Sequence, residues 1–310
     1  MKVNIISRSN GVGLDRDVEI IKTALEQDGH EVITSHYKAI FSWIKGLLGM
    51  ERSDLNIFLE RIYPWWCPTA TKNSIVPNQE RFPKRDLNLL KKMDLVLCKT
   101  LHALEIFSQH HQSSRFISFT SEDRQQLEPS KEPTFFHLAG KSTLKGTDVL
   151  LQLWKENPQW PELTLVQHPS NTPEHVPKNV NLIDQYLSDE DLKTLQNKHL
   201  YHLCPSLSEG WGHYIAEAAS CGVTVITTDA PPMNELISNE RGHLISSNHQ
   251  EPRHLGINFY VDPVTLESKI NEILAANDET HHDRGKKARQ WYEENHNNFE
   301  QLIQNAIRTL

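Results

Sequence analysis

The sequence predicts an α/β fold of two parallel-sheet domains in tandem, with a C-terminal helical segment. Short apolar runs of strand character alternate with helical segments through most of the 310-residue chain. A polar stretch with two prolines interrupts this alternation once, and the alternation then resumes. After Pro263 the pattern is helical to the end. Alternation of this kind is typical of mainly parallel sheets covered by helices on both faces. Two such sheets place a ligand cleft between the carboxyl ends of their strands.

The first predicted domain spans residues 1–125. Its strand candidates are apolar runs of four to six residues: Val3–Ser7, Glu31–Thr34, Asp54–Leu59, Ser74–Pro77, Asp94–Cys98 and Arg115–Phe119. Helical segments fall between several of them, most clearly at Asp15–Gln27 and Thr100–His110. The polar stretch at 126–133 is interpreted as the linker.

The second predicted domain spans residues 134–285. Its strands are expected at Thr134–Ala139, Leu163–Gln167, Asn179–Ile183, Leu200–Cys204, Val223–Thr228 and His243–Ser246. Its helices are expected at Thr147–Lys155, Ser188–Asn197, Gly212–Ser220 and Met233–Ser238. Residues 286–310 carry aromatic and aliphatic side chains at roughly helical spacing, so we expect C-terminal helices there.

Composition narrows the class of protein. The net charge of −8 argues against broad, sequence-independent binding of nucleic acid, which relies on many Lys and Arg contacts to phosphate. No uninterrupted run of about 18 apolar residues occurs, so no membrane-spanning helix is expected. The N-terminus is interpreted as a first strand rather than a signal peptide, and the four cysteines lack metal-ligand spacing. We therefore expect a cytoplasmic protein with reduced, buried thiols.

The stretch from Pro205 to Gly222 is the most informative part of the chain. It sets Glu209 in a glycine-rich turn and Glu217, eight positions later, inside the predicted helix that follows. The mouth of a helix leaves N–H groups without helical partners, and these are a natural seat for phosphate. Two carboxylates beside that seat can bind hydroxyl groups on different parts of one ligand. A sugar nucleotide has this combination of phosphate and hydroxyls.

Two sequence blocks resemble the retaining nucleotide-sugar glycosyltransferases of the GT-B fold, in the large family that includes sucrose synthases and bacterial mannosyltransferases. The first block has Glu, seven residues and Glu, preceded by Pro205-Ser206 and followed by Cys221-Gly222-Val223 and a short strand. The second, Phe135–Gly146, resembles the family's strand, Gly-Arg turn and Lys-Gly helix start. The resemblance implies two Rossmann-like domains facing each other across a cleft, with the C-terminal helices of 286–310 packing across both domains.

The resemblance also implies roles for residues of the second domain. Lys141, which stands where the family usually has arginine, and Lys145 would contact the diphosphate. Glu217 would hold the ribose hydroxyls, and Glu209 the hydroxyls of the donor sugar. The segment that usually meets the base corresponds to 184–187. The remaining donor-side candidates are backbone positions around the sugar and phosphates and residues of the base segment: Gly140, Gly210, Trp211, Gly212, His213, Gln185 and Tyr186. A third and weaker resemblance to the family lies in the segment 227–236, which contains Glu235. This residue is either a ligand contact or a first-turn carboxylate that complements the helix dipole.

The first domain matches the family less well. A loop with Gly11 and Gly13 follows the first strand, where the family places a glycine loop near the diphosphate and acceptor. The family often has a histidine at the end of a middle strand, whereas the corresponding strand here ends in Asn78-Gln79-Glu80-Arg81. Polar residues at the carboxyl ends of parallel strands face the cleft, or serve as ordinary helix caps and turns. The acceptor-side candidates are Asn78, Gln79, Glu80, Lys99 and Thr100, together with Thr120-Ser121-Glu122-Asp123-Arg124 at the end of a later strand.

Three other patterns are given structural interpretations. Asp15-Arg16-Asp17 has the spacing of a metal-binding pair, but it falls at a predicted helix start, where Asp is a favoured cap. The paired histidines at 110–111 and 281–282 are interpreted as solvated surface. The apolar run at 37–50 is interpreted as a packed or cleft-side helix, with a helix laid on a membrane as the alternative, because only Lys38 and Lys45 accompany it.

The sequence thus predicts a retaining, metal-independent glycosyltransferase without a resident cofactor. Its donor would be a nucleoside-diphosphate sugar such as a UDP- or GDP-sugar. Its acceptor would be the hydroxyl of a glycan, a lipid-linked glycan or another molecule. Two alternatives remain: an epimerase that acts on the sugar nucleotide itself, for which Glu80 and a nearby histidine could supply acid and base, and a non-catalytic sugar-nucleotide-binding protein.

Overall fold

The computed structural model describes residues 1–9 and 13–310. It divides the chain into two compact units. The first unit contains Met1–Ser121, Arg253–Gly256 and Asn295–Leu310, and the second contains Glu122–Pro252 and Ile257–Glu294. The first boundary falls after Ser121, four residues before the end of the predicted first domain. The long last helix, α9 (Asp278–Ile307), contributes to both units.

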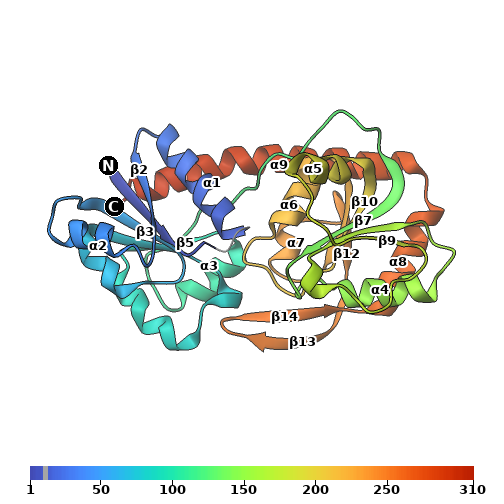
Figure 1. Cartoon of the computed structure of the whole chain (residues 1–310), viewed down its shortest axis with the longest axis horizontal. Coiled ribbons are helices and arrows are strands. Elements are labelled where there is room, and N and C mark those ends of the chain that lie inside the picture. The colour runs from blue at the N-terminus through green and yellow to red at the C-terminus, as the bar shows by residue number, and fades with distance from the viewer. Residues whose placement is uncertain (10–12) are drawn as a thin grey trace. The chain divides into compact units, whose positions relative to one another are not determined.

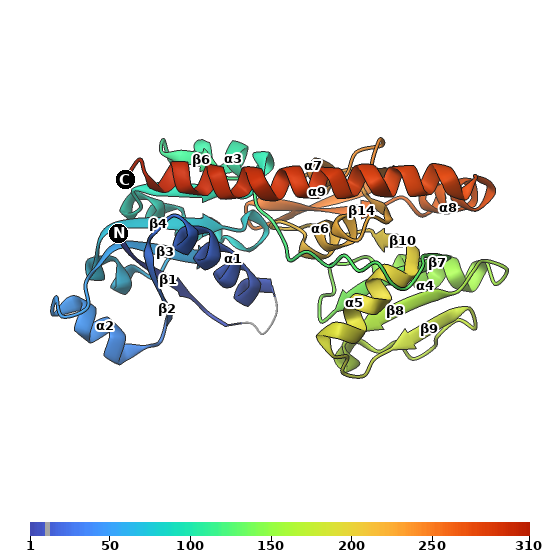
Figure 2. The same ribbon diagram turned by 90° about the horizontal axis from the view of Figure 1, so that it is seen from above.

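The first unit is built on a six-stranded parallel sheet in the order β2-β1-β3-β4-β5-β6. Its strands are β1 (Lys2–Ser7), β2 (Glu31–His36), β3 (Ser53–Glu60), β4 (Ala70–Pro77), β5 (Leu95–Cys98) and β6 (Ser114–Phe116). Its helices are α1 (Gly13–Gln27), α2 (Ile40–Leu47), α3 (Leu101–Ser108) and the short 3₁₀ segments η1 (Pro64–Thr69), η2 (Gln79–Arg81) and η3 (Lys84–Lys92). Helix α1 packs against β1, β2 and β3 (Figures 1 and 2).

The second unit repeats this plan with a sheet in the order β12-β11-β10-β7-β8-β9. The strands are β7 (Glu132–Gly140), β8 (Leu163–Gln167), β9 (Val180–Ile183), β10 (His199–Cys204), β11 (Thr224–Thr228) and β12 (Gly242–Ile245). The helices are α4 (Thr147–Glu156), α5 (Asp189–Lys198), α6 (His213–Ser220), α7 (Met233–Leu236) and α8 (Pro263–Ala275), with the 3₁₀ segment η4 (Pro169–Asn171). The α/β fold class and the strand pattern predicted from the sequence are confirmed.

Each sheet has a buried core of the kind that the apolar strands predict. In the first unit, Ile6, Phe58, Ile75 and Val96 come from four different strands and belong to one cluster, and none is exposed. In the second unit, α4 and α8 contribute Trp154 and Ile270 to a cluster that includes strand residues of β7, β8 and β10. Strands covered by helices on their faces read as continuous apolar runs, so their existence could be predicted from sequence.

A two-stranded sheet, β13 (Ser247–Arg253) and β14 (Gly256–Val261), was not predicted (Figure 1). Most of β13 is exposed and polar, including Asn248, His249, Gln250 and Glu251. Such a strand lacks the apolar alternation by which half-buried strands are found. Residues 247–253 form a strand because they pair with β14, and not because of their own composition.

The cysteine prediction is confirmed. All four cysteines are free, and Cys98, Cys204 and Cys221 are buried, while Cys67 is partly buried. Burial raises the pKa of the Cys98 and Cys221 thiols to about 12. These two thiols are therefore protonated, inert packing groups near neutral pH.

Four buried histidines make the second unit sensitive to acid. Burial lowers the pKa of His137, His199 and His243 to about 4, and that of His202 to about 3. These residues are at most 5% exposed. Because an unfolded histidine titrates near about 6.5, the unfolded chain binds more protons than the folded chain below that pH. Folding stability is thus fully present above about pH 6.5 and is lost as the pH falls toward 4.

We expect the thermal midpoint to decrease when the pH is lowered from 7 to 4.5. Each of these histidines should contribute on the order of 1–3 kcal/mol to the lost free energy of unfolding. His202→Gln should make the midpoint depend less steeply on pH. The same change at the exposed His282 is the matched control and should leave the slope as it is. Thermal denaturation across this pH range measures how the midpoint depends on pH. An unchanged slope in His202→Gln would show that the buried His202 does not cause the sensitivity to acid.

Candidate functional site

Two turns meet at the carboxyl edge of the second sheet. Strands β7 and β10 are parallel neighbours, so the chain leaves both at the same edge. Residues 141–146 follow β7 and lead into α4, and residues 205–212 follow β10 and lead into α6. The Leu207 N–H donates to the Leu144 carbonyl at 2.9 Å, which joins the two turns. Sequence blocks more than sixty residues apart thus form one local structure.

Gly146 makes this close approach possible. It is the N-cap of α4 and has a φ of +69°, a left-handed conformation that favours glycine. A Cβ at this position would lie 2.3 Å from the carbonyl oxygen of Pro205. No side chain fits at that distance without displacing the backbone of the 205–212 turn.

We expect Gly146→Ala to destabilise the protein by about 2–4 kcal/mol, because strain at positive φ and a backbone clash add together. Gly222→Ala is the matched control: Gly222 has a φ of +64°, but its Cβ would meet other atoms only at 3.7 Å. That control should show the conformational cost alone, about 1 kcal/mol. Chemical denaturation compares the two, and equal losses of stability would contradict the role of the close approach.

The meeting point of the two turns holds a compact cluster of four polar side chains. Lys145 Nζ lies 2.6 Å from Glu209 Oε1 and 3.7 Å from the centre of the Tyr214 ring. The Ser206 hydroxyl donates to Glu209 Oε1 at 2.5 Å and lies 2.5 Å from the Tyr214 hydroxyl. The side chains of Lys145 and Glu209 are 16% and 13% exposed. The structure therefore brings together two of the residues predicted as functional, and both reach the surface.

This cluster is preorganised for a charged, hydroxyl-bearing ligand. Tyr214 is buried, and burial raises the pKa of its hydroxyl well above the usual value, so the ring remains a neutral support beneath the ammonium. Lys145 offers a positive charge that can turn from the Glu209 carboxylate to a phosphate. Glu209, when released from Lys145, offers acceptor oxygens to hydroxyl groups.

Glu217 lies in a different environment from the one that the sequence interpretation implies. It is fully buried, and Gln196 Nε2 donates to its Oε2 at 3.0 Å. Gln196 Oε1 in turn accepts from Nε of Arg124, which is also fully buried. Contact between Glu217 and a ribose needs a movement that exposes the carboxylate. In this conformation its evident function is to hold α6 to α5.

Arg124 is the centre of that network. Its Nη1 atom lies 2.7 Å from Asp189 Oδ1, and its backbone N–H donates to Ser220 Oγ. Burial lowers the pKa of Arg124, but its hydrogen bond to Asp189 and the negative charge of Glu217 raise it by more, so the net shift of the pKa is upward. The sequence places Arg124 among polar residues at the end of a predicted strand, as an acceptor-side candidate, and such a polar stretch predicts an exposed residue rather than a buried one.

The other donor-side candidates lie at or near this edge. Gly140 ends β7 with a φ of +55°, and Lys141 follows it as an exposed residue. Gly212 caps α6 with a φ of +105°. Gln185 and Tyr186 are exposed in the turn between β9 and α5. Trp211, Gly210 and Gly212 are buried, and His213 is partly buried as the first residue of α6.

The candidates of the first unit have structural partners. Lys99 is 2% exposed and forms an ion pair with Asp17 at 2.9 Å. Thr100 is the N-cap of α3, and its side chain accepts a hydrogen bond from the Ala103 N–H. It therefore serves as an ordinary helix cap, the structural alternative given for such residues. Gln79 and Glu80 are buried in η2, which Asn78 precedes. Gly13 begins α1, whereas Gly11 lies outside the described residues.

Another polar group in the first unit escaped the sequence analysis. Glu60 ends β3, is 3% exposed and has a φ of +64°, which is uncommon for a residue with a side chain. Arg8 lies 2.7 Å from its carboxylate, and Arg61 and Arg81 lie 3.9 Å away. Backbone strain of this kind concentrates at functional sites. No sequence motif marks it, because the charges come from the ends of different strands.

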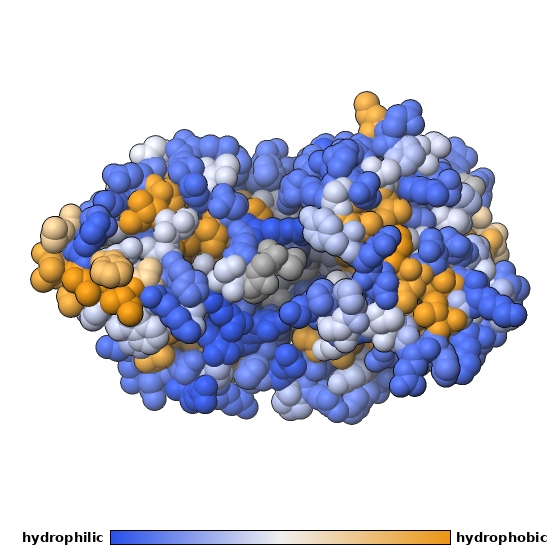
Figure 3. Space-filling view, in the orientation of Figure 1, coloured by the Kyte–Doolittle hydropathy of each residue, from blue (hydrophilic) through white to orange (hydrophobic). Residues whose placement is uncertain are grey.

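The run at 37–50 forms α2 and the turns around it. Its apolar side chains are largely exposed: Phe41 is 84% exposed, Leu48 69% and Met50 72%. They belong to the apolar area at the left end of Figure 3, where Figure 1 places α2. The packed-helix interpretation does not account for these residues, and contact with a membrane surface remains a prediction. Within the described chain, none of the helices combines the length and hydropathy that a membrane crossing requires.

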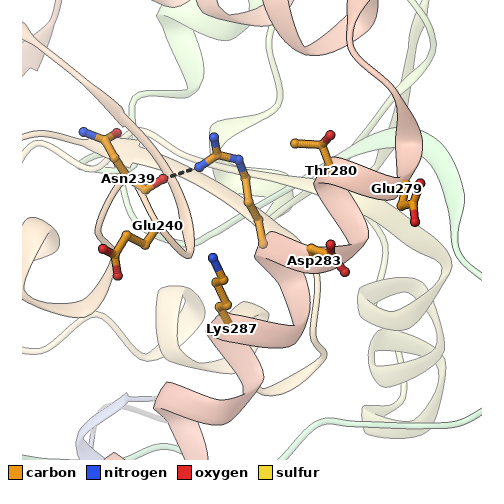
Figure 4. A pocket seen from close by; sticks show the side chains of 7 residues that line it. Asn239, Glu240, Glu279, Thr280, Asp283 and Lys287 are labelled. Atoms are coloured by element: carbon orange, nitrogen blue, oxygen red, sulfur yellow. Dashed lines mark hydrogen bonds between the residues drawn. The ribbon is translucent and has the colours of Figure 1, made fainter.

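A groove of about 480 Å³ lies elsewhere on the second unit (Figure 4). Residues from the start of α9 and from the 239–240 turn line it, among them Glu240, Asp283 and Lys287. Arg284 crosses it and donates to the carbonyls of Asn239 and Gly242. Three carboxylates and two cations line it, and the Lys145–Glu209 pair is not part of its lining.

The sequence of the second unit matches a known family. Residues 173–291 match the family described as glycosyl transferases group 1. A 153-residue segment is 26% identical to an uncharacterized glycosyltransferase 335 from Sulfolobus islandicus rod-shaped virus 1, and the match covers 46% of each chain. The chain therefore spans about half the length of that relative.

Solved structures resemble the whole chain. HepE from Anabaena, in complex with UDP and glucose, matches with a TM-score of 0.76 and 15% identity, over 100% of both chains. A glycosyltransferase from Rickettsia africae matches with a TM-score of 0.75 and 14% identity, over 97% of this chain and 96% of its own. Sucrose-phosphate synthase from Thermosynechococcus elongatus matches with a TM-score of 0.71 and 15% identity, over 100% and 98%. The chain has the GT-B fold of these proteins, and its residues 173–291 match the glycosyl transferases group 1 family.

Proposed function

We propose that this protein is a retaining glycosyltransferase that moves a sugar from a nucleoside-diphosphate sugar to an acceptor hydroxyl. The observation that carries the proposal is the contact between Lys145 and Glu209, held by two turns that both match the sequence blocks of the family. A cation and a carboxylate at one helix mouth are suited to a ligand that combines diphosphate and sugar hydroxyls. The UDP and glucose bound by HepE support this ligand class.

In the proposed reaction the bond between the sugar carbon and the diphosphate oxygen breaks, and a bond from the same carbon to the acceptor oxygen forms. The acceptor proton passes to an oxygen of the leaving phosphate. Lys145, the exposed Lys141 and the N–H groups at the start of α6 stabilise the negative charge that collects on the diphosphate. Glu209 orients the sugar through its hydroxyls. We propose that these groups suffice without a metal ion or a resident cofactor, and that the reaction takes place in the cytoplasm.

A screen of UDP- and GDP-sugars by thermal shift identifies the donor, because a ligand that binds only the folded state raises the midpoint. The stabilising donor is then incubated with the protein, with and without a panel of oligosaccharide acceptors. Release of nucleoside diphosphate with formation of a glycoside of unchanged anomeric configuration is the expected result. Conversion of the donor to another sugar nucleotide without acceptor would instead establish an epimerase. Binding without turnover across the acceptors would count against catalysis.

A further inference from the structure

The second unit has a pocket of about 430 Å³ beside α4 that the proposed donor site does not use. It lies at the first turn of α4, next to the ends of β8 and β14. The residues that matter for the argument are Thr147, Asp148, Gln167, Asn171, Leu207 and Tyr260. Neither Lys145 nor Glu209 lines it.

The topology separates the pocket from α6. The step from β7 through α4 to β8 and the step from β10 through α6 to β11 run in opposite directions along the sheet. Right-handed crossovers therefore place α4 and α6 on opposite faces. Lys145 contacts Tyr214 of α6, whereas the pocket is lined by Thr147 and Asp148 of α4. The two sites share the 141–146 turn, but they involve helices on opposite faces of the sheet.

Gln167 gives the pocket an unsatisfied acceptor. Its side chain ends β8 and is only 8% exposed. Its Nε2 group donates to the Asn171 carbonyl at 2.7 Å, which fixes the amide. Its Oε1 atom has no hydrogen-bond partner among the residues that the structure describes. A buried amide oxygen ordinarily has a donor, so this atom indicates a ligand that supplies one.

The charge of the lining selects against an anion. Asp148 is the one ionised side chain among the lining residues of the described chain. Together, Asp148 and Gln167 Oε1 accept hydrogen bonds, and a phosphate would offer them none. The ligand must therefore be a neutral or cationic donor of hydrogen bonds.

The remaining lining residues favour a sugar ring over a cation. Tyr260 and Leu207 contribute apolar surface, and the hydroxyls of Ser142 and Thr143 can donate as well as accept. The Tyr260 hydroxyl donates to Glu251 at 3.0 Å, which holds the ring in place at the pocket wall. A pyranose presents an apolar face to an aromatic ring and hydroxyl donors at its rim. Pockets that combine apolar surface with a few placed polar groups bind ligands of this kind.

We propose that this pocket binds an uncharged saccharide unit, with Tyr260 against one face of the sugar ring and Gln167 and Asp148 accepting from its hydroxyls. The site is separate from the Lys145–Glu209 cluster. The proposal that a saccharide binds here does not depend on the proposed transfer reaction.

Saturation-transfer NMR tests the proposal on the full chain, with methyl α-glucoside, methyl α-mannoside, methyl α-galactoside and maltose as probes. UDP and GDP are present at saturating concentration, to occupy the nucleotide site. We expect at least one probe to bind with a Kd of about 1 mM. Tyr260→Ala and Gln167→Leu should each weaken it about tenfold, whereas Tyr260→Phe, which keeps the ring, should change it by less than about threefold.

Lys287→Ala, in the groove of Figure 4, is the control outside the pocket and should leave saccharide binding unchanged. Circular dichroism and the thermal midpoint establish that each variant is folded. The proposal is overturned if none of the four probes binds, or if Tyr260→Ala and Gln167→Leu bind the probe as the wild-type protein does. Displacement of the saccharide by UDP or GDP would place it in the nucleotide site and would equally overturn the proposal.

Discussion

Lys145→Met is expected to lower the turnover of the nucleotide-sugar donor by about a hundredfold or more, because it removes a charge that acts on the leaving diphosphate. Removal of one such preorganised donor costs roughly 10²–10³ in kcat. Methionine keeps the length and apolar stem of lysine, so packing over the Tyr214 ring is largely retained. The loss should fall mainly on kcat, since the negative charge on the diphosphate is greatest as the bond breaks.

Lys155→Met is the matched control for this prediction. Lys155 lies in the last turn of α4, is exposed, and is two helical turns from the site. Its replacement should leave turnover within about twofold of wild type. Steady-state release of nucleoside diphosphate measures both variants. Equal activity of Lys145→Met and the wild-type protein would show that Lys145 does not stabilise the leaving diphosphate.

Arg124→Met is expected to destabilise the protein by about 3 kcal/mol, because it leaves Glu217 buried without the cation that balances it. Arg124 is not exposed, and it connects Asp189, Gln196 and the backbone around Ser220. For a chain of this size the thermal midpoint should fall by roughly 6–12 °C. The pair with Asp189 contributes little of this by itself, since that carboxylate is 64% exposed and can be solvated.

Arg85→Met is the matched control, because the Arg85 side chain is 82% exposed beside Asp86. It should shift the midpoint by less than about 1 °C. The double variant Arg124→Met with Glu217→Gln tests whether the uncompensated charge of Glu217 causes the loss. Removal of that buried negative charge should recover part of the lost stability. A loss in Arg124→Met no larger than that in Arg85→Met would show that the buried network does not hold this unit together.

The fold could be predicted because its strands are buried on both faces. Runs such as Val3–Ser7 and Leu200–Cys204 are mostly apolar and are buried along their whole length, which is the pattern of parallel strands covered by helices. The contact of Lys145 with Glu209 could also be anticipated. Both residues follow strands at short, defined distances, and β7 and β10 turned out to be neighbours in register.

Features that depend on long-range contacts could not be predicted. Arg124 lies in a polar stretch, yet it is fully buried and its partner Asp189 is 65 residues away. Glu217 has the spacing of a ligand-binding residue, but its burial depends on Gln196 of α5. The strand β13 is polar along its length and exists through its partner β14. In each case the deciding interaction joins segments whose proximity the local sequence does not encode.

The most direct measurement is a crystal structure with the nucleoside diphosphate that gives the largest thermal shift. The account predicts that a diphosphate oxygen takes the place of Glu209 as a partner of Lys145 Nζ, at the mouth of α6. It also predicts that the Glu209 carboxylate turns toward the position of the sugar. A diphosphate bound away from Lys145, with the Lys145–Glu209 ion pair intact, would contradict it.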